Sequence, residues 1–477
     1  MDIADLAASA LKKLAVHTGK KLKKAGPAPE IPEAVPFISD DPDGVYYCGS
    51  GESVIMPGDV TKTKYYIAGY RMDHRVTGVL DDLTARAMWL GCSENDGILL
   101  VSIDTIGLTG ADSDKIKLRV SSRLGGLDVS RIHLSCTHSH ASFDTVGYWG
   151  RLFPPETGVN KEYMKILTDG VVDAAQQAFE SRTPGKLYFG SVHVPEAISK
   201  GRFEHPSNDL LTRFRFVPDD GGKEVWLLNF SAHPNTLGGD NTLISADYPR
   251  FIRDRVAEES DAEVLFVVGA IASVNIADLG TEDRLERTEK GGRLLAEAAL
   301  GMSDEQLPAS ILMLTQKYDA PIDNYVLAFM AIIKMCSSVK VRSDVSSTGI
   351  ALRTQMTYLK LGGKRILMLP GEAFTELIYG GYVGAEESAT GRGPEENPQP
   401  LAEMINDPEL IVFGVTDDMT GYMVPPNDAV LHPTQAYLSS AHDRFDRNHY
   451  HETNGLGNLI PQTVSEVFGK IIEKTEK

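Results

Sequence analysis

The chain has 477 residues, of which 42% are hydrophobic and 24% are charged, and its formal net charge at pH 7 is -19. This balance is typical of a soluble globular enzyme, and the length allows one large domain or two to three ordinary ones. The negative charge argues against a nucleic-acid partner, because such a field repels phosphate backbones. No apolar stretch approaches the roughly 20 residues that span a bilayer.

The first 45 residues differ in character from the rest of the chain. Residues 1–26 combine apolar positions at helical spacing with six lysines and predict a basic amphipathic helix, and residues 27–36, PAPEIPEAVP, predict an extended linker. Such a helix either is a solvated arm or oligomer contact, or lies on an anionic membrane surface. We expect residues 1–45 to form this arm and linker, and residues 46–477 to form a single large catalytic domain.

Strands and helices alternate along the remaining sequence. Runs rich in Val, Ile and Leu predict buried strands at 97–104, 131–138, 225–233, 263–275 and 365–372. Helical periodicity predicts helices at 160–182, 247–260 and 283–300. This alternation predicts an α/β fold with mixed β-sheets covered by helices.

Each predicted strand ends in a polar side chain, namely Asp104, His138, His233, Asn275 and Glu372. Ligands in open α/β sheets gather beyond the carboxyl ends of strands, and two histidines with a carboxylate suit a catalytic zinc ion. In LSCTHSHAS (134–142), His140 lies two residues after His138, so an extended segment turns both rings into one pocket. Packed or solvated histidines are the alternative. The pattern by itself leaves both a metal-assisted hydrolase and ordinary structural histidines open.

Two aspartates near these strands do not require a catalytic role, and neither do the four cysteines. Asp247 either caps the helix that begins near Tyr248 or orients a ligand, and Asp104 is expected to support a site residue or the fold and not to be catalytic. The four cysteines are widely separated and form no C-x-x-C pair. Reduced thiols, and with them a cytoplasmic location, are therefore expected.

Several longer motifs point to one family. The motifs are THSHA (137–141), HPNTLGGDNTLISADYP (233–249), PGE (370–372), GVLDDLTARAMWL (78–90), GYMV (421–424) and HYHE (449–452). From about residue 50 onward, the chain resembles the neutral/alkaline (non-lysosomal) ceramidase family, specifically its N-terminal catalytic domain. The resemblance implies that domain's α/β fold and a zinc-dependent hydrolase.

The resemblance also implies roles for individual residues. The implied zinc ligands are His138, His233, Glu372 and Tyr422. His140 is implied to contact the substrate and the attacking water, and Tyr450 is implied to bind the substrate. Arg202, in ISKGRFEHPSND, lies where the family has an N-R-S segment.

The sequence departs from the family pattern at two places. Residues 270–275, AIASVN, lack the acidic residue and the proline of the family's G-D-V-S-P-N segment, and residues 141–144, ASFD, lack its glycine and proline. We also expect no counterpart of the family's C-terminal immunoglobulin-like domain or secretory signal. These departures argue against ceramide as the substrate, although the metal motifs are retained.

We therefore expect a Zn²⁺-dependent hydrolase in which metal-activated water attacks an amide (N-acyl) bond. Its substrate is expected to be a small molecule or an acyl or glycoconjugate that is smaller or more soluble than long-chain ceramide. Hydrolysis of an ester or glycoconjugate linkage and metal binding without catalysis are the alternatives. Self-association into a homo-oligomer stays open, as does membrane contact by the basic arm.

Overall fold

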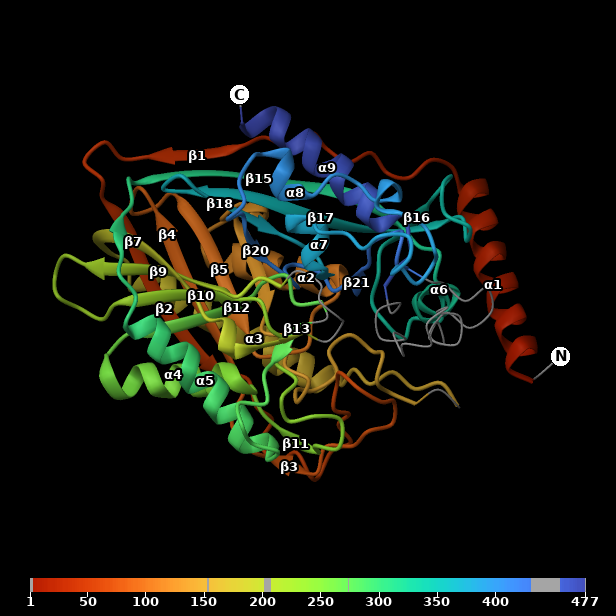
Figure 1. Ribbon diagram of the computed structural model, residues 1–477, viewed down its shortest axis with the longest axis horizontal. Helices are drawn as coiled ribbons and strands as arrows, with labels where there is room; N and C mark the ends of the chain where they lie inside the picture. The colour runs from red at the N-terminus through yellow and green to blue at the C-terminus, as the bar shows by residue number, and fades with distance from the viewer. Residues whose placement is uncertain (1–2, 152–153, 201–206, 273, 430–454, 477) are drawn as a thin grey trace.

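The structure of the protein, a computed structural model, describes residues 3–151, 154–200, 207–272, 274–429 and 455–476. Over these residues two large β-sheets stack face to face, and helices cover the outer face of each sheet (Figure 1). The order of layers is helices, nine-stranded sheet, six-stranded sheet, helices. The predicted α/β class with mixed, helix-covered sheets is confirmed.

The nine-stranded sheet has the order β12-β10-β9-β7-β2-β4-β5-β6, and β14 also pairs with β7. Its strands are β2 (Tyr46–Val54), β4 (Thr84–Gly91), β5 (Gly97–Ile103), β6 (Ile132–Cys136), β7 (Thr183–His193), β9 (Leu210–Pro218), β10 (Val225–Phe230), β12 (Glu263–Val268) and β14 (Glu305–Gln306). The β5–β6 and β10–β12 pairs are parallel, and the other pairs are antiparallel. The sheet curls on itself, so that strands far apart in this order approach each other. This is seen in the hydrogen bond that Ser102 of β5 donates to the Phe266 carbonyl of β12 over 2.6 Å.

The six-stranded sheet has the order β1-β15-β17-β18-β20, with β16 paired to β17. Its strands are β1 (Phe37–Asp40), β15 (Ser310–Pro321), β16 (Lys340–Arg342), β17 (Ile350–Leu361), β18 (Lys364–Met368) and β20 (Ile411–Phe413). Short pairs join β3 (Gly78–Val79) to β11 (Leu243–Ile244), β8 (Ile198–Lys200) to β13 (Val274–Ile276), and β19 (Glu372–Ala373) to β21 (Tyr422–Met423).

Helices flank the two sheets on opposite sides. The nine-stranded sheet packs against α2 (Gly110–Arg123), α3 (Lys161–Glu180), α4 (Tyr248–Glu259) and α5 (Arg284–Leu300). The six-stranded sheet packs against α1 (Ile3–Ala25), α6 (Tyr325–Ile332), α7 (Thr375–Tyr379), α8 (Leu401–Met404) and α9 (Ile460–Thr475). In Figure 1, α9 lies along the upper sheet and α4 and α5 lie below the lower one.

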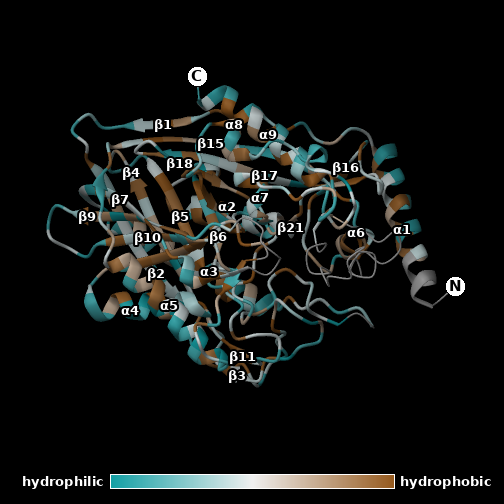
Figure 2. Cartoon of the chain, in the orientation of Figure 1, coloured by the Kyte–Doolittle hydropathy of each residue, from teal (hydrophilic) through white to brown (hydrophobic). Residues whose placement is uncertain are grey.

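Both faces of the central strands are buried, which explains their unbroken apolar runs. In β10, Trp226, Leu228 and Phe230 face the helices, whereas Val225 and Leu227 face the second sheet. Successive side chains of a strand point to opposite faces, so a strand between two apolar layers needs apolar residues at every position. Figure 2 shows these strands in brown, between helices whose outer surfaces are largely teal.

The predicted extended conformation around the two histidines is wrong. Strand β6 ends at Cys136, and His138 adopts a left-handed backbone conformation with φ 62°. A strained, non-glycine residue of this kind persists only where its surroundings hold it, and such residues cluster at functional sites. The two rings therefore meet through a turn, and not through strand alternation.

Helix α1 lies against the body of the protein. Ala15 is fully buried in the apolar cluster that contains α6, and the Lys12 ammonium lies 5.1 Å from the Tyr325 ring centroid. The boundary predicted between residues 45 and 46 stays a prediction. All four cysteines are buried free thiols, as expected. No helix in the described part of the chain is long and apolar enough to cross a membrane.

Candidate metal centre

His138 is held at the end of β6 by the neighbouring strand. Its backbone N–H donates to the Thr105 carbonyl, and its ring Nδ1 lies 2.6 Å from the Ile106 carbonyl oxygen. A carbonyl oxygen only accepts, so Nδ1 carries the proton of this bond. In the neutral ring, Nε2 is then a lone-pair donor that points away from the strand.

His233 follows β10 and is held in the same way. Its N–H donates to the Val274 carbonyl over 2.9 Å, and its Nδ1 lies 2.8 Å from the Ile271 carbonyl oxygen. Its Nε2 lies 2.9 Å from Glu372 Oε2. Residues from β5–β6 and from β10–β12 therefore present two imidazoles of the same tautomer to one point.

Glu372 and Tyr422 come from the small parallel pair β19–β21, in which they are direct neighbours. The Glu372 carboxylate is buried, and its Oε2 lies 3.3 Å from His138 Nε2. Burial by itself raises the pKa of Glu372, but when His138 and His233 are protonated their charges and hydrogen bonds outweigh burial and hold this pKa well below the ordinary range. The Tyr422 ring centroid lies 6.3 Å from that of His233.

His140 completes the group, which we call the histidine centre (His138, His140, His233 and Glu372). Its N–H donates to the Pro234 carbonyl, and its Nε2 lies 3.2 Å from His138 Nε2. One ligand atom from each of the three histidines lies within 4.8 Å of the others. Tyr70 packs edge-on against the His140 ring, with 5.1 Å between the ring centroids.

This donor set fits a metal ion. When both imidazoles are neutral, their Nε2 lone pairs and Glu372 Oε2 converge at 2.9 and 3.3 Å, and a metal ion bound among them takes the place of ring protons. Imidazole nitrogen and carboxylate oxygen are ordinary zinc ligands, and the Nδ1–carbonyl bonds are the outer support that metal-binding histidines usually have.

The other strand-end residues lie beside the centre. Asp104 forms a buried two-point ion pair with Arg253, over 2.7 and 2.8 Å, and also accepts from Thr84. Asp247, with φ 59°, caps α4 through the Tyr248 N–H and accepts from Thr236. Both aspartates brace the segments that carry the histidines.

Some expected residues cannot be placed, and others were missed. Arg202 and Tyr450 lie outside the described residues. Sequence reasoning missed Tyr70, which covers His140, and the polar cavity beside the centre, which is described below. The sequence contained one signal for the cavity. Asn235, which lines it, directly follows the His-Pro pair of the 233–249 motif and so lies close to the predicted ligand His233.

Comparisons with known proteins give one family match. Residues 46–282 match the family model described as neutral/alkaline non-lysosomal ceramidase, N-terminal, which confirms the resemblance expected from the motifs. Glu372 and Tyr422 lie beyond the matched residues. No curated protein sequence matches the chain.

Two solved structures share the fold. The crystal structure of neutral ceramidase from Pseudomonas aeruginosa has a TM-score of 0.66 at 14% identity, over 90% of this chain and 75% of that chain. A structure described as ceramidase complexed with C2 has a TM-score of 0.66 at 13% identity, over 89% of this chain and 74% of that chain. At these identities the similarity shows the fold alone.

Proposed function

From the match of residues 46–282 to the neutral/alkaline non-lysosomal ceramidase family and from the shared fold, we propose that this protein is a metal-dependent hydrolase of amide (N-acyl) bonds. The observation that carries the proposal is the convergence of His138 Nε2, His233 Nε2 and Glu372 Oε2 within the family-like fold. A buried group of acceptors at the ends of two strand pairs is suited to a catalytic cation.

The proposed metal is Zn²⁺, held by His138, His233 and Glu372, with Tyr422 as the fourth ligand. When bound, zinc polarises a carbonyl group and lowers the pKa of water toward neutrality. Glu372 reduces the net charge of the site, and the backbone carbonyls behind the two histidines keep their rings in one orientation.

His140 is the proposed proton carrier. Its ring borders the metal ligands, and an imidazole suits proton transfer near neutral pH. It accepts the proton of the attacking water and delivers it to the leaving amine. Tyr450 and Arg202 remain proposed substrate-binding residues.

The proposed substrate is smaller or more soluble than long-chain ceramide. The cavity beside the centre supports this choice, since most of its lining side chains are polar or charged: Tyr70, Ser199, Asn235, Thr236, Asn275, Asp278, Arg284 and Arg287. A long hydrocarbon chain requires an apolar channel, because burying polar groups without partners is unfavourable.

The test combines metal analysis with a substrate panel. We expect about one zinc ion per chain and hydrolysis of short, water-soluble N-acyl amides that is lost with a chelator and restored by zinc. The panel includes esters, glycoconjugates and long-chain ceramide in detergent. Efficient cleavage of ceramide alone contradicts the proposed substrate, and cleavage of only esters or glycoconjugates contradicts the proposed bond. Bound metal without any hydrolysis indicates a non-catalytic metal-binding protein.

A further inference from the structure

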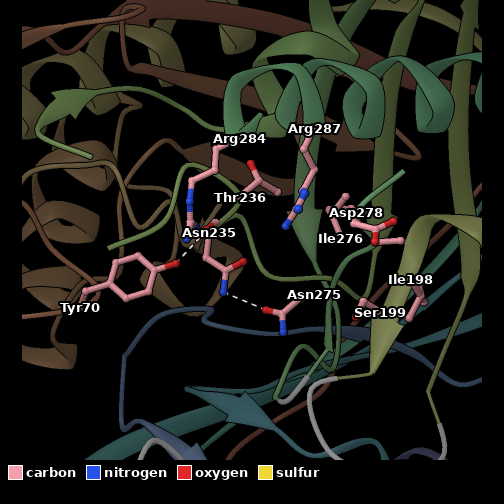
Figure 3. A pocket seen from close by; sticks show the side chains of 11 residues that line it. Tyr70, Ile198, Ser199, Asn235, Thr236, Asn275, Ile276, Asp278, Arg284 and Arg287 are labelled. Carbon is pink, nitrogen blue, oxygen red and sulfur yellow. Dashed lines mark hydrogen bonds between the residues drawn. The ribbon is translucent and has the colours of Figure 1, made fainter. Parts of the chain in front are cut away.

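A polar cavity of about 500 Å³ opens beside the histidine centre. Figure 3 shows its side chains: Arg284 and Arg287 extend from α5 into the cavity, opposite Asn235 and Asn275, with Tyr70 at one end. Cavities of this size accommodate small organic ligands.

The cavity wall is continuous with the histidine centre. Asn235 follows His233 by two residues, and its side-chain amide donates to Asn275 Oδ1 over 2.8 Å. Asn275 itself forms a backbone bridge with His233. Tyr70 donates to the Asn235 carbonyl over 2.8 Å while its ring packs on His140. The cavity and the histidine centre therefore share one wall, formed by Asn235, Asn275 and Tyr70.

The charge of the cavity is positive. The Arg284 guanidinium has neither a hydrogen bond nor an ion pair among the residues that the structure describes, and it lies against Gly238. Arg287 donates only to the Thr281 carbonyl, over 3.2 Å, and its Nε is buried without a partner. Asp278 is the single carboxylate in the cavity lining. Two guanidinium groups thus face one carboxylate.

An arginine pair without carboxylate partners is unusual in this protein. Arg213, Arg215 and Arg253 all bind buried or half-buried carboxylates. Arg293, farther along α5, pairs with Glu258 and Glu289. The planar guanidinium group matches the oxygens of a carboxylate or a phosphate. Arg284 and Arg287, which have no carboxylate partner among the described residues, are therefore suited to bind an anionic ligand.

We propose that this cavity is a subsite for an anionic group of the substrate, a carboxylate or a phosphate, bound by Arg284 and Arg287. The proposal rests on the proposed amide hydrolysis and narrows its substrates to amides that carry such a group. The net charge of -19 repels anions at a distance, so selection depends on these short-range contacts.

The test compares charged and neutral probes on the metal-loaded protein. Calorimetry measures binding of N-acetylglycine, its uncharged analogue N-acetylglycinamide, and inorganic phosphate. Arg284→Gln and Arg287→Gln should each weaken binding of at least one anion by about tenfold or more, the usual scale for a hydrogen bond to a charged group. Neither substitution should change binding of the uncharged amide by that amount. Arg293→Gln, on the same helix but outside the cavity, is the matched control and should match the wild type.

The outcomes separate the subsite from the catalytic proposal. A preference for N-acetylglycine assigns a carboxylate, and a preference for phosphate assigns a phosphate. Anion binding that is absent, or unchanged in both arginine variants, overturns the subsite, even if neutral amides are hydrolysed. Arginine-dependent anion binding without amide hydrolysis keeps the subsite and overturns the proposed function.

Discussion

Two buried polar clusters lie in the same sandwich and differ in one respect. In the Asp417 cluster (Lys117, His133, Gln355 and Asp417), every contact joins a donor to the carboxylate. Lys117 Nζ, His133 Nδ1 and Gln355 Nε2 lie 2.6, 2.8 and 2.8 Å from its oxygens, and the Leu134 N–H donates over 2.9 Å. In the histidine centre, the Nδ1 atoms of His138 and His233 already face backbone carbonyls, and both Nε2 atoms converge on the single Glu372 carboxylate at 3.3 and 2.9 Å.

The comparison separates a structural cluster from a ligand site. Burial alone raises the pKa of Asp417, but Lys117 and His133 hold it well below the ordinary range, so the charge of this carboxylate is compensated without any ligand. A group of acceptors that face one another is complete only when a cation is added. The pairing of donors with acceptors, more than burial, therefore distinguishes the candidate metal site from a structural cluster.

The largest effect is expected for His233→Ala. Removing one of the converging ligands should reduce bound zinc from about one ion per chain to a small fraction and lower hydrolysis to background. Elemental analysis and an amide assay measure both. His193→Ala is the control, since His193 is exposed and pairs with Asp209. A His233→Ala variant with normal metal content would show that the assigned ligand set is wrong.

His140→Gln should separate proton transfer from metal binding. We expect zinc to remain bound while turnover falls about 10²–10⁴-fold, the range for general acid–base catalysis. The variant is compared with His138→Ala for kcat and for metal content. Equal loss of metal in the two variants would make His140 a ligand, which its place in the three-histidine group allows.

Asp417→Asn should destabilise the fold and leave the metal in place. The substitution keeps a residue type that tolerates the φ of 68° at this position, but it leaves Lys117 buried without a counter-charge. Breaking a buried ion pair in this way lowers the free energy of unfolding by about 3–5 kcal/mol. Denaturant unfolding measures the change.

The control for Asp417→Asn is Asp344→Asn, which removes an exposed partner of Arg342 and Lys23 and should change the free energy of unfolding by less than about 1 kcal/mol. If Asp417→Asn loses metal but keeps its stability, the Asp417 cluster supports metal binding, and its assignment as a purely structural cluster is wrong.

The smallest effect is expected for Asp144, whose buried carboxylate has neutral donors in place of charged ones. It accepts backbone N–H groups of residues 146, 147 and 149. Burial raises its pKa from 3.8 to about 6, despite the lowering effect of these bonds. The folded chain therefore takes up a proton between pH 7 and pH 5 that the unfolded chain does not, and stability rises as the pH falls through this range. Relative to Asp144→Asn, the wild type should gain about 1 kcal/mol of unfolding free energy on going from pH 7 to pH 5. Parallel pH profiles for the two proteins would contradict the raised pKa.

The sequence predicted the elements that carry the centre better than it predicted their geometry. The strand expected at 225–233 forms as β10 (Val225–Phe230), and the helix expected at 247–260 forms as α4 (Tyr248–Glu259). Strong apolar periodicity defines such elements locally. The turn at His138 was missed, because a left-handed residue depends on the contacts that hold it and has no strong sequence signal outside glycine.

The amino-acid sequence by itself predicted an α/β class with mixed, helix-covered sheets, and its motifs contained the residues that converge in the histidine centre. Burial on both faces gave the strands continuous apolar runs, and the motifs around His138, His233 and Glu372 are local in the sequence. Only the tertiary structure decided which polar residues share a site. Curling of the nine-stranded sheet brings the segments after β6 and β10 together, whereas Asp104 is bound by Arg253. The tertiary structure also placed Arg284 and Arg287 of α5 beside Asn235 and Asn275. Contacts between such distant segments depend on packing and not on sequence spacing.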